Sequence, residues 1–133
     1  MTKTYTIFGC PTPLARARHA GGHVYDNQKN SKLIFGITLR ELHDEKPLFK
    51  GPLHLDIVFY MPISNSWSDK KKNERSCNYH VIKPDISNLL KFVEDCATGI
   101  LYRDDCVICS VNMKKIYDDG EKPRTVLTIK ELG

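Results

Sequence analysis

The chain has 133 residues, a length that fits one folded domain with a hydrophobic core of its own. Its 20 basic and 16 acidic residues leave a net charge of +4, and 41% of the residues are hydrophobic. These values are those of an ordinary globular protein, and no apolar run approaches the roughly 20 residues of a transmembrane helix. The small basic excess is compatible with a nucleic-acid partner and equally with an unspecialised surface.

Five cysteines, an odd number, lie at irregular spacings along the chain. The opening residues Met1–Tyr5 lack the apolar run of a secretory signal peptide. We therefore expect reduced thiols and a cytoplasmic location.

The first expected strand covers residues 4–8, where residues alternate and strand formers dominate. A stretch with two prolines then opens a loop that carries Arg16, Arg18 and His19. Gly21–Gly22 is expected to keep this loop flexible. The basic residues are either a solvated surface or contacts to DNA phosphates.

A helix is expected from Asn27 to His43, although Gly36 interrupts an imperfect periodicity. After a loop marked by proline and glycine, Leu53–Met61 is the strongest strand signal in the chain. Apolar residues alternate there with polar ones, so one face of the strand should be buried. That face carries Leu53, Leu55, Ile57 and Phe59.

Residues 62–79 are expected to form a long polar loop, which in a compact domain is usually functional or disordered. The loop contains a lysine run, Lys70–Lys72, followed by Arg75. A lysine run is either solvated or a supply of positive charge for a DNA backbone. Trp67, the only tryptophan, could stack on an unpaired base or cover the core.

Residues 85–97 predict an amphipathic helix that opens at Asp85, a good N-cap residue, and ends before Gly99. A separate polar side of this helix carries Asn88, Lys91 and Asp95. The apolar side carries Ile86, Leu89, Leu90, Val93 and Ala97.

A strand is expected from Cys106 to Tyr117, a turn over residues 118–123 and a returning strand over residues 125–129, which together suggest a hairpin. The order strand, helix, strand, helix, strand, strand predicts an α+β fold. We expect one domain spanning residues 1–133, with a mixed or antiparallel sheet covered by helices.

Paired carboxylates, Asp104 and Asp105, stand at the entrance of that late strand. Packing against the helix of residues 85–97 could bring Asp85, Asp105 and Lys91 into one acidic pocket. Converging aspartates are the expected apparatus for holding Mg²⁺, which prefers hard oxygen ligands and promotes phosphodiester hydrolysis. Asp85 and Asp105 are the first candidates for metal ligands, and Asp104 is a third.

The central motif runs Lys83-Pro84-Asp85, then Asn88-Leu89, Lys91, Asp95 and finally Asp104-Asp105. It resembles the motif of the RusA family of Holliday-junction resolvases, and Pro13, Arg16 and Arg18 agree with an early basic segment of that family. The resemblance covers nearly the whole chain. It implies a RusA-like homodimeric endodeoxyribonuclease that uses magnesium and cuts four-way DNA in recombination and repair, without a membrane partner. Such proteins commonly come from phages and prophages.

Under this resemblance Asp85, Lys91 and Asp105 are the catalytic residues. Lys91 then directs its charge at the scissile phosphate or positions the water, whereas the simpler interpretation pairs it with Asp95 on the helix surface. Asn88 and Asp95 are expected to support the site. The residues expected to bind DNA are Arg16, Arg18, Lys70, Lys71, Lys72, Arg75, His80 and Lys83.

Ser87 departs from the family pattern, which usually has an acid two residues after the first Asp. A serine is a weaker magnesium ligand than a carboxylate and carries no charge. The alternative function is therefore a junction-binding protein whose cleavage is impaired.

A zinc site is a further alternative, since Cys77, His80, Cys106 and Cys109 form two pairs. The last two cysteines are expected on a strand, where a spacing of three sends side chains to opposite faces, so this alternative is disfavoured.

Overall fold

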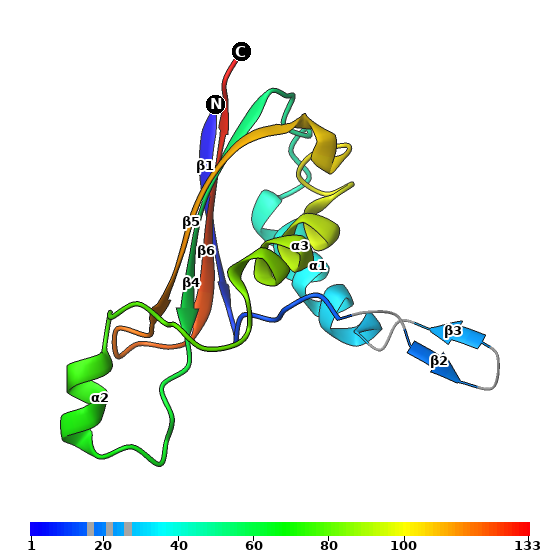
Figure 1. The fold of residues 1–133 in the computed structure, drawn as a ribbon. Coiled ribbons are helices and arrows are strands. Elements are labelled where there is room, and N and C mark those ends of the chain that lie inside the picture. The colour runs from blue at the N-terminus through cyan, green and yellow to red at the C-terminus, as the bar shows by residue number, and fades with distance from the viewer. Residues whose placement is uncertain (16–17, 21–22, 26–27) are drawn as a thin grey trace. The chain divides into compact units, whose positions relative to one another are not determined.

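The structure is a computed structural model that describes residues 1–15, 18–20, 23–25 and 28–133 (Figure 1). Its strands are β1 (Thr2–Phe8), β2 (Arg18–Ala20), β3 (His23–Tyr25), β4 (Leu53–Met61), β5 (Ile108–Tyr117) and β6 (Arg124–Glu131). Its helices are α1 (Lys29–His43), α2 (Asp69–Arg75) and α3 (Ile86–Ala97), with a short 3₁₀ turn at Asp105–Val107. A mixed sheet with helices confirms the expected α+β class. Within the described ranges, no helix is long and apolar enough to cross a membrane.

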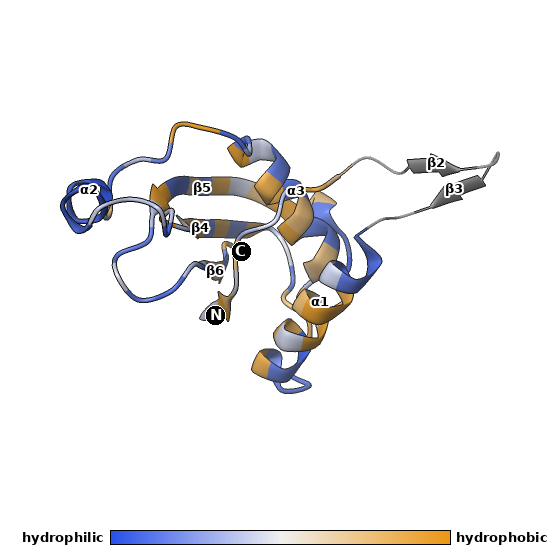
Figure 2. Cartoon of the chain, turned by 90° about the horizontal axis from the view of Figure 1, so that it is seen from below, coloured by the Kyte–Doolittle hydropathy of each residue, from blue (hydrophilic) through white to orange (hydrophobic). Residues whose placement is uncertain are grey.

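The strand β4 lies inside a four-stranded sheet of order β1-β6-β4-β5 (Figure 1). It runs parallel to β5 and antiparallel to β6. Hydrophobic and hydrophilic residues alternate from Leu53 to Ile57, and both colours occur along β4 in Figure 2. The buried alternate positions are at most 2% exposed, and each apolar side chain of this kind contributes roughly 1.5–3 kcal/mol relative to exposure. The strand predicted at Leu53–Met61 is confirmed with both boundaries.

The expectation that the last two strands form a hairpin is wrong. Both β5 and β6 pair with β4, so that Ile57 has Met113 of β5 on one side and Leu127 of β6 on the other. Residues 118–123 therefore cross the end of β4 instead of forming a tight turn. Strands lie about 4.8 Å apart, so a connection of this length easily spans one intervening strand. The strand pattern in a sequence does not specify which neighbour a strand will pair with.

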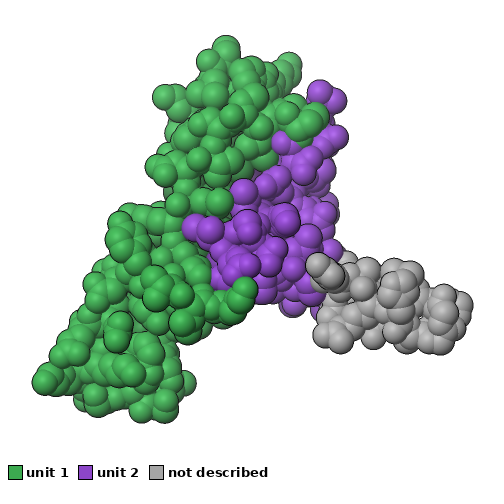
Figure 3. Space-filling model, in the orientation of Figure 1, with its two compact units in different colours: residues 1–11, 50–83, 106–133 green, residues 12–49, 84–105 purple. Residues whose placement is uncertain are grey.

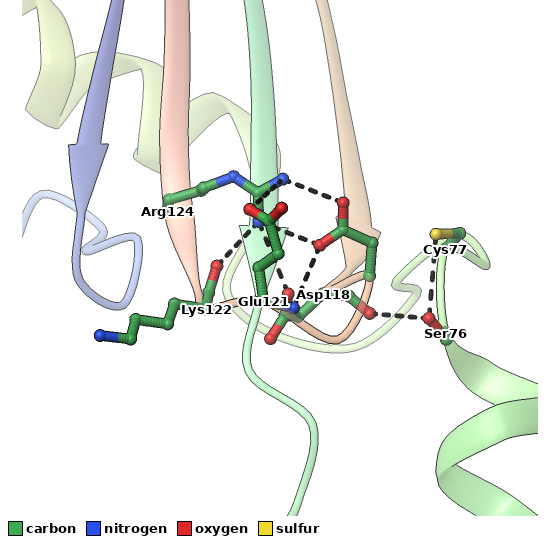
Figure 4. Close-up of polar contacts among 7 residues, drawn as sticks. Ser76, Cys77, Asp118, Glu121, Lys122 and Arg124 are labelled. Atoms are coloured by element: carbon green, nitrogen blue, oxygen red, sulfur yellow. Dashed lines mark hydrogen bonds and ion pairs between the residues drawn. The ribbon is translucent and has the colours of Figure 1, made fainter.

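The crossing connection is held by Arg124 at the start of β6 (Figure 4). Its guanidinium donates to both carboxylate oxygens of Asp119, at 3.1 and 3.0 Å, and to the Lys122 carbonyl at 3.0 Å. It also lies over the Tyr60 ring, 3.7 Å from the centroid. The hydrogen bonds from Arg124 hold the pKa of Asp119 down to about 2. This pairing fixes the route of the chain past β4.

We expect Asp119→Asn to lower the free energy of unfolding at pH 7 by about 1 kcal/mol, a figure reduced for the partial exposure of the carboxylate. Its folded pKa lies below the ordinary value of 3.8. The ion pair therefore stabilises the fold above that pH and is lost as the pH falls toward 2. Denaturant unfolding of both proteins between pH 7 and pH 2.5 checks this. Glu41→Gln, which removes an exposed charge on α1, is the control. A stability difference that does not change with pH would contradict the prediction.

The polar loop expected over residues 62–79 contains the helix α2, so the loop assignment was wrong for residues 69–75. Ser68 caps this helix, and its Oγ accepts a hydrogen bond from the Lys71 N–H at 3.2 Å. Asp69 in the first turn and Arg75 in the last turn suit the helix dipole. The helix is hydrophilic throughout (Figure 2), so apolar periodicity could not reveal it.

Trp67, just before α2, is half-buried and packs against Tyr117 of β5, with ring centroids 5.5 Å apart. The Lys71 ammonium lies 4.5 Å from the centroid of the Trp67 ring. These contacts favour a packing role for Trp67 over base stacking.

The chain's contacts gather in two compact units (Figure 3). Unit 1 comprises residues 1–11, 50–83 and 106–133, and contains the four-stranded sheet and α2. Unit 2 comprises residues 12–49 and 84–105, and contains α1, α3, β2 and β3.

Within unit 2, α1 packs against α3 through Phe35 and Phe92, whose rings meet edge to face at 5.6 Å. A Cβ at Gly36 would lie 3.4 Å from the Ile100 side chain, which is close to ordinary van der Waals contact. The helix begins at Lys29, two residues later than expected. Residues 18–20 and 23–25, expected in a loop, form the antiparallel pair β2–β3. Strands of three residues are too short for an alternation pattern to predict.

Candidate active site

Asp85 occupies the N-cap of α3, as the sequence indicated. Its backbone is extended, and its carbonyl accepts hydrogen bonds from the N–H groups of Asn88 at 3.1 Å and Leu89 at 3.2 Å. Its exposed carboxylate makes no capping hydrogen bond to the helix. The backbone of Asp85 therefore begins the helix without committing the carboxylate to the cap.

Ser87, Lys91 and Glu94 follow one another along one face of α3, at spacings of four and three residues. Ser87 and Lys91 are exposed. Asp95 forms an ion pair with Lys32 of α1, with its carboxylate 3.0 Å from the ammonium. Asp95 therefore has a partner on another helix, and the role of Lys91 stays a prediction.

Glu94 contacts Asp105. The sequence reasoning predicted Asp105 but missed Glu94. Partial burial raises the pKa of Glu94, and the charge of Asp105 and a hydrogen bond between the two side chains raise it further, against the charge of Lys91. The pKa of Asp105 is also raised, first by a hydrogen bond shared with the Asp104 side chain. Three carboxyl groups therefore lie in a continuous series of contacts. The signal that could have identified Glu94 is its place seven residues after Ser87, on the same helical face.

Asp105 begins the 3₁₀ turn that leads into β5, and the strand expected from Cys106 starts at Ile108. The paired acids thus stand two residues further from the strand than expected. Asp104 and Asp105 are both exposed.

The donors at this site fit a divalent cation chemically, since carboxylate oxygens are the hard ligands that Mg²⁺ prefers. Across residues 1–15, 18–20, 23–25 and 28–133, no three His, Cys, Asp or Glu side chains converge closely enough to hold an ion. The carboxylates around α3 are Asp85, Glu94, Asp104 and Asp105, of which all but the half-buried Glu94 are exposed. Exposed side chains reorient within picoseconds to nanoseconds, so the carboxylate oxygens of those three are not fixed in the positions described.

The residues of the zinc alternative are dispersed among different environments. Cys77, Cys106 and Cys109 are exposed, whereas His80 is buried. Cys106 lies in the 3₁₀ turn and Cys109 on β5. The described residues thus offer no grouping of these side chains that a zinc ion could join.

The lysine run and Arg75 all lie on α2, which concentrates positive charge on one short helix. Lys70, Lys71 and Arg75 are exposed and Lys72 is half-buried. Lys83, also expected to bind DNA, is exposed just before α3. These side chains remain predicted phosphate contacts.

His80, a further predicted DNA contact, is only 7% exposed, and its ring packs against Tyr117 at 4.9 Å. Burial lowers the pKa of His80, and the charge of Lys115 lowers it further. The imidazole is therefore uncharged near neutral pH, which makes it a weak partner for a phosphate. Arg16 lies outside the described residues, and of Arg18 on β2 only the backbone is described.

The family model described as Endodeoxyribonuclease RusA matches residues 9–130. The chain belongs to the RusA family. The resemblance drawn from the motif around Asp85 is therefore confirmed. RusA-family nucleases act on branched DNA junctions and generally depend on a divalent metal. This RusA-family chain is also 28% identical to the uncharacterized protein YqaN of Bacillus subtilis strain 168, over 138 residues that cover 97% of this chain and 96% of that protein.

Proposed function

We propose that this protein is a magnesium-dependent endonuclease that resolves four-way DNA junctions by paired symmetric nicks, in DNA recombination and repair. The observation that supports this is the arrangement around α3, inside the RusA match. Asp85 stands at the N-cap without a side-chain cap bond, Lys91 lies on the exposed face, and Asp105 contacts Glu94. In this proposal residues 1–133 form one endonuclease domain that includes both compact units. The protein acts in the cytoplasm of a bacterium or a phage-infected cell.

In this mechanism Asp85 and Asp105, together with Asp104, hold Mg²⁺. The bound ion supplies an activated water and neutralises charge on the phosphate and the leaving oxygen. Lys91 directs its ammonium at the scissile phosphate, where it stabilises the charge that develops during cleavage. Asn88 lies in the first turn of the helix that Asp85 begins, and its side-chain amide supports the site from there.

The protein acts as a homodimer in this proposal. A four-way junction is cut at two symmetric positions, and a two-fold dimer presents two equivalent active sites. Light scattering of the purified protein, alone and with junction DNA, gives the number of chains directly.

The second candidate function is junction binding with impaired cleavage. The observation behind it is Ser87, which is exposed on the same face of α3 as Lys91. A serine contributes no carboxylate to a metal site there. Synthetic four-way junctions distinguish the two functions, with linear duplex of the same sequence as the control. Magnesium-dependent nicking of the junction supports the nuclease. Tight junction binding without magnesium, and no nicking with it, supports the binding protein.

We expect Ser87→Asp to lower the magnesium concentration needed for half-maximal cleavage. A carboxylate at this position adds a hard anionic ligand near Asp85 and strengthens the attraction for a dication. An added acid also repels DNA phosphate and raises the pKa of Asp85, which opposes the gain. Cleavage rate against magnesium concentration, for both proteins, measures the midpoint. A midpoint that stays constant or moves upward places Ser87 outside the coordination sphere, with Asp85, Asp104 and Asp105 sufficient.

A further inference from the structure

The segment of residues 79–82, in unit 1 between α2 and α3, reverses the usual distribution of polar and apolar side chains. Tyr79, Val81 and Ile82 are 74%, 85% and 62% exposed, whereas His80 is 7% exposed. Tyr79 and Val81 have the two highest exposed fractions among the large hydrophobic side chains of the described residues. Figure 2 shows a hydrophobic section in this connection, ahead of α3. Exposed apolar clusters of this kind mark interaction sites.

Backbone hydrogen bonds to β5, an edge strand of the sheet, hold this segment in place. The His80 N–H donates to the Lys115 carbonyl at 3.0 Å, and Tyr79 pairs antiparallel with Ile116. The Lys115 ammonium donates to the Ile82 carbonyl at 2.6 Å. Val81 and its neighbours are therefore displayed by an ordered backbone.

The register of this pairing decides which side chains face outward. A slip of one residue along β5 would bury Val81 and expose His80, because neighbouring residues of an extended segment point to opposite sides. The observed register instead buries an imidazole whose Nδ1 has no hydrogen-bond partner. Burial of an unpartnered polar atom is unfavourable, so the packing of His80 alone does not explain why its apolar neighbours lie outside.

The surroundings of the segment suit a nucleic acid. Lys83 follows it directly, and Lys70, Lys71 and Arg75 lie on α2 in the same unit. Covalent connectivity keeps Val81 within about 14 Å of Asp85, because an extended chain spans at most about 3.6 Å per residue. An apolar segment followed by a lysine, in a unit that also carries the basic helix α2, suits exposed base faces flanked by phosphates.

We propose that Tyr79, Val81 and Ile82 form a branch-point wedge that stacks on base pairs exposed at the crossover of a DNA junction. This inference rests on the proposed function and adds the means by which branched DNA is preferred to linear duplex. Apolar side chains that enter between base steps unstack them and kink the duplex. At a crossover the stacking is already interrupted, so the wedge meets a smaller energetic cost there than in a continuous helix. His80 anchors the wedge from the inner side.

The test uses the full-length protein and a junction carrying 2-aminopurine at the crossover, which fluoresces more strongly when its base is unstacked. We expect the parent protein to change this fluorescence, because the wedge alters the stacking of the labelled base, and Tyr79→Ser/Val81→Ser to lose most of the change. The ratio of junction to duplex affinity should fall about tenfold or more, in line with the loss of base stacking on an aromatic side chain. The affinity for linear duplex and its salt dependence should stay constant, since no charge is removed.

Leu132→Ser is the matched control, because it removes a 49% exposed apolar side chain from the same unit. It should leave fluorescence and selectivity at parental values. Light scattering of every variant tests the other possible partner, a second copy of this chain. If the double variant shifts the oligomeric state and keeps its selectivity, the surface binds protein and the wedge is wrong.

The two proposals fail differently. A parent protein that prefers and nicks junctions, with a double variant equal to it in fluorescence and selectivity, overturns the wedge and leaves the nuclease standing. A parent protein with no preference for junctions overturns both. The wedge is supported if the double variant loses the fluorescence response and the preference for junctions while the Leu132→Ser control keeps both.

Discussion

Asp85→Asn and Asp105→Asn should each reduce junction cleavage to background, a loss of roughly a hundredfold or more. Each substitution removes a negatively charged oxygen from the proposed metal site, and a bound metal contributes several kcal/mol of transition-state stabilisation. Binding of junction DNA should survive, because removing negative charge near a phosphate does not oppose association. Single-turnover cleavage with excess protein measures the effect.

Thermal unfolding with and without magnesium gives a second readout of the same site. A ligand that binds only the folded state raises the melting temperature, so the parent should be stabilised by magnesium and the two variants less so. Glu41→Gln, an exposed acid on α1, serves as the charge-matched control and should behave as the parent. Parental cleavage by either Asn variant, at matched protein and magnesium concentrations, would show that the ion is held elsewhere.

Simultaneous replacement of Lys70, Lys71 and Lys72 by Ala should weaken DNA binding by roughly tenfold at moderate salt. The slope of log affinity against log salt should decrease by up to about 2–3, because each lost phosphate contact removes roughly 0.9 of slope on duplex DNA. Helix α2 should persist, since alanine is the strongest helix former and the Ser68 cap is unchanged. The thermal stability should move little, with the contact of Lys71 to Trp67 contributing roughly 0.5–1 kcal/mol.

A second triple variant, with Lys3, Lys46 and Lys130 replaced by Ala, removes the same charge from elsewhere in the chain. It separates a local contact on α2 from a general effect of net charge. Equal salt slopes for the two triple variants would assign the lysines of α2 to a solvated surface with no particular role in binding.

Local patterns determined much of this molecule. The alternation in Leu53–Met61 predicted β4 because a strand that buries one face must place apolar residues at every second position. The helix after Asp85 followed from a capping residue and an apolar stripe at helical spacing. The motif from Lys83 to Asp105 identified the family, since several spaced polar residues had to match together. Each of these signals lies within one short stretch of chain.

Sequence reasoning missed α2, β2 and β3 for a different reason. These elements have seven, three and three residues, too few for periodicity to develop. The helix α2 is also polar on every side, so only its Ser68 cap and the charges at its ends indicate a helix.

Pairing between distant segments was decided only by the tertiary structure. Residues 118–123 looked like a hairpin turn, but β4 lies between β5 and β6 and hydrogen-bonds to both. The contact of Glu94 with Asp105 and the outward display of Val81 are of the same kind. The sequence by itself determined most local elements and the family motif, because those depend on residues a few positions apart. Three features depend instead on which segments pack together, which is a property of the whole fold. They are the strand order, the contact of Glu94 with Asp105, and the exposure of apolar side chains beside the motif.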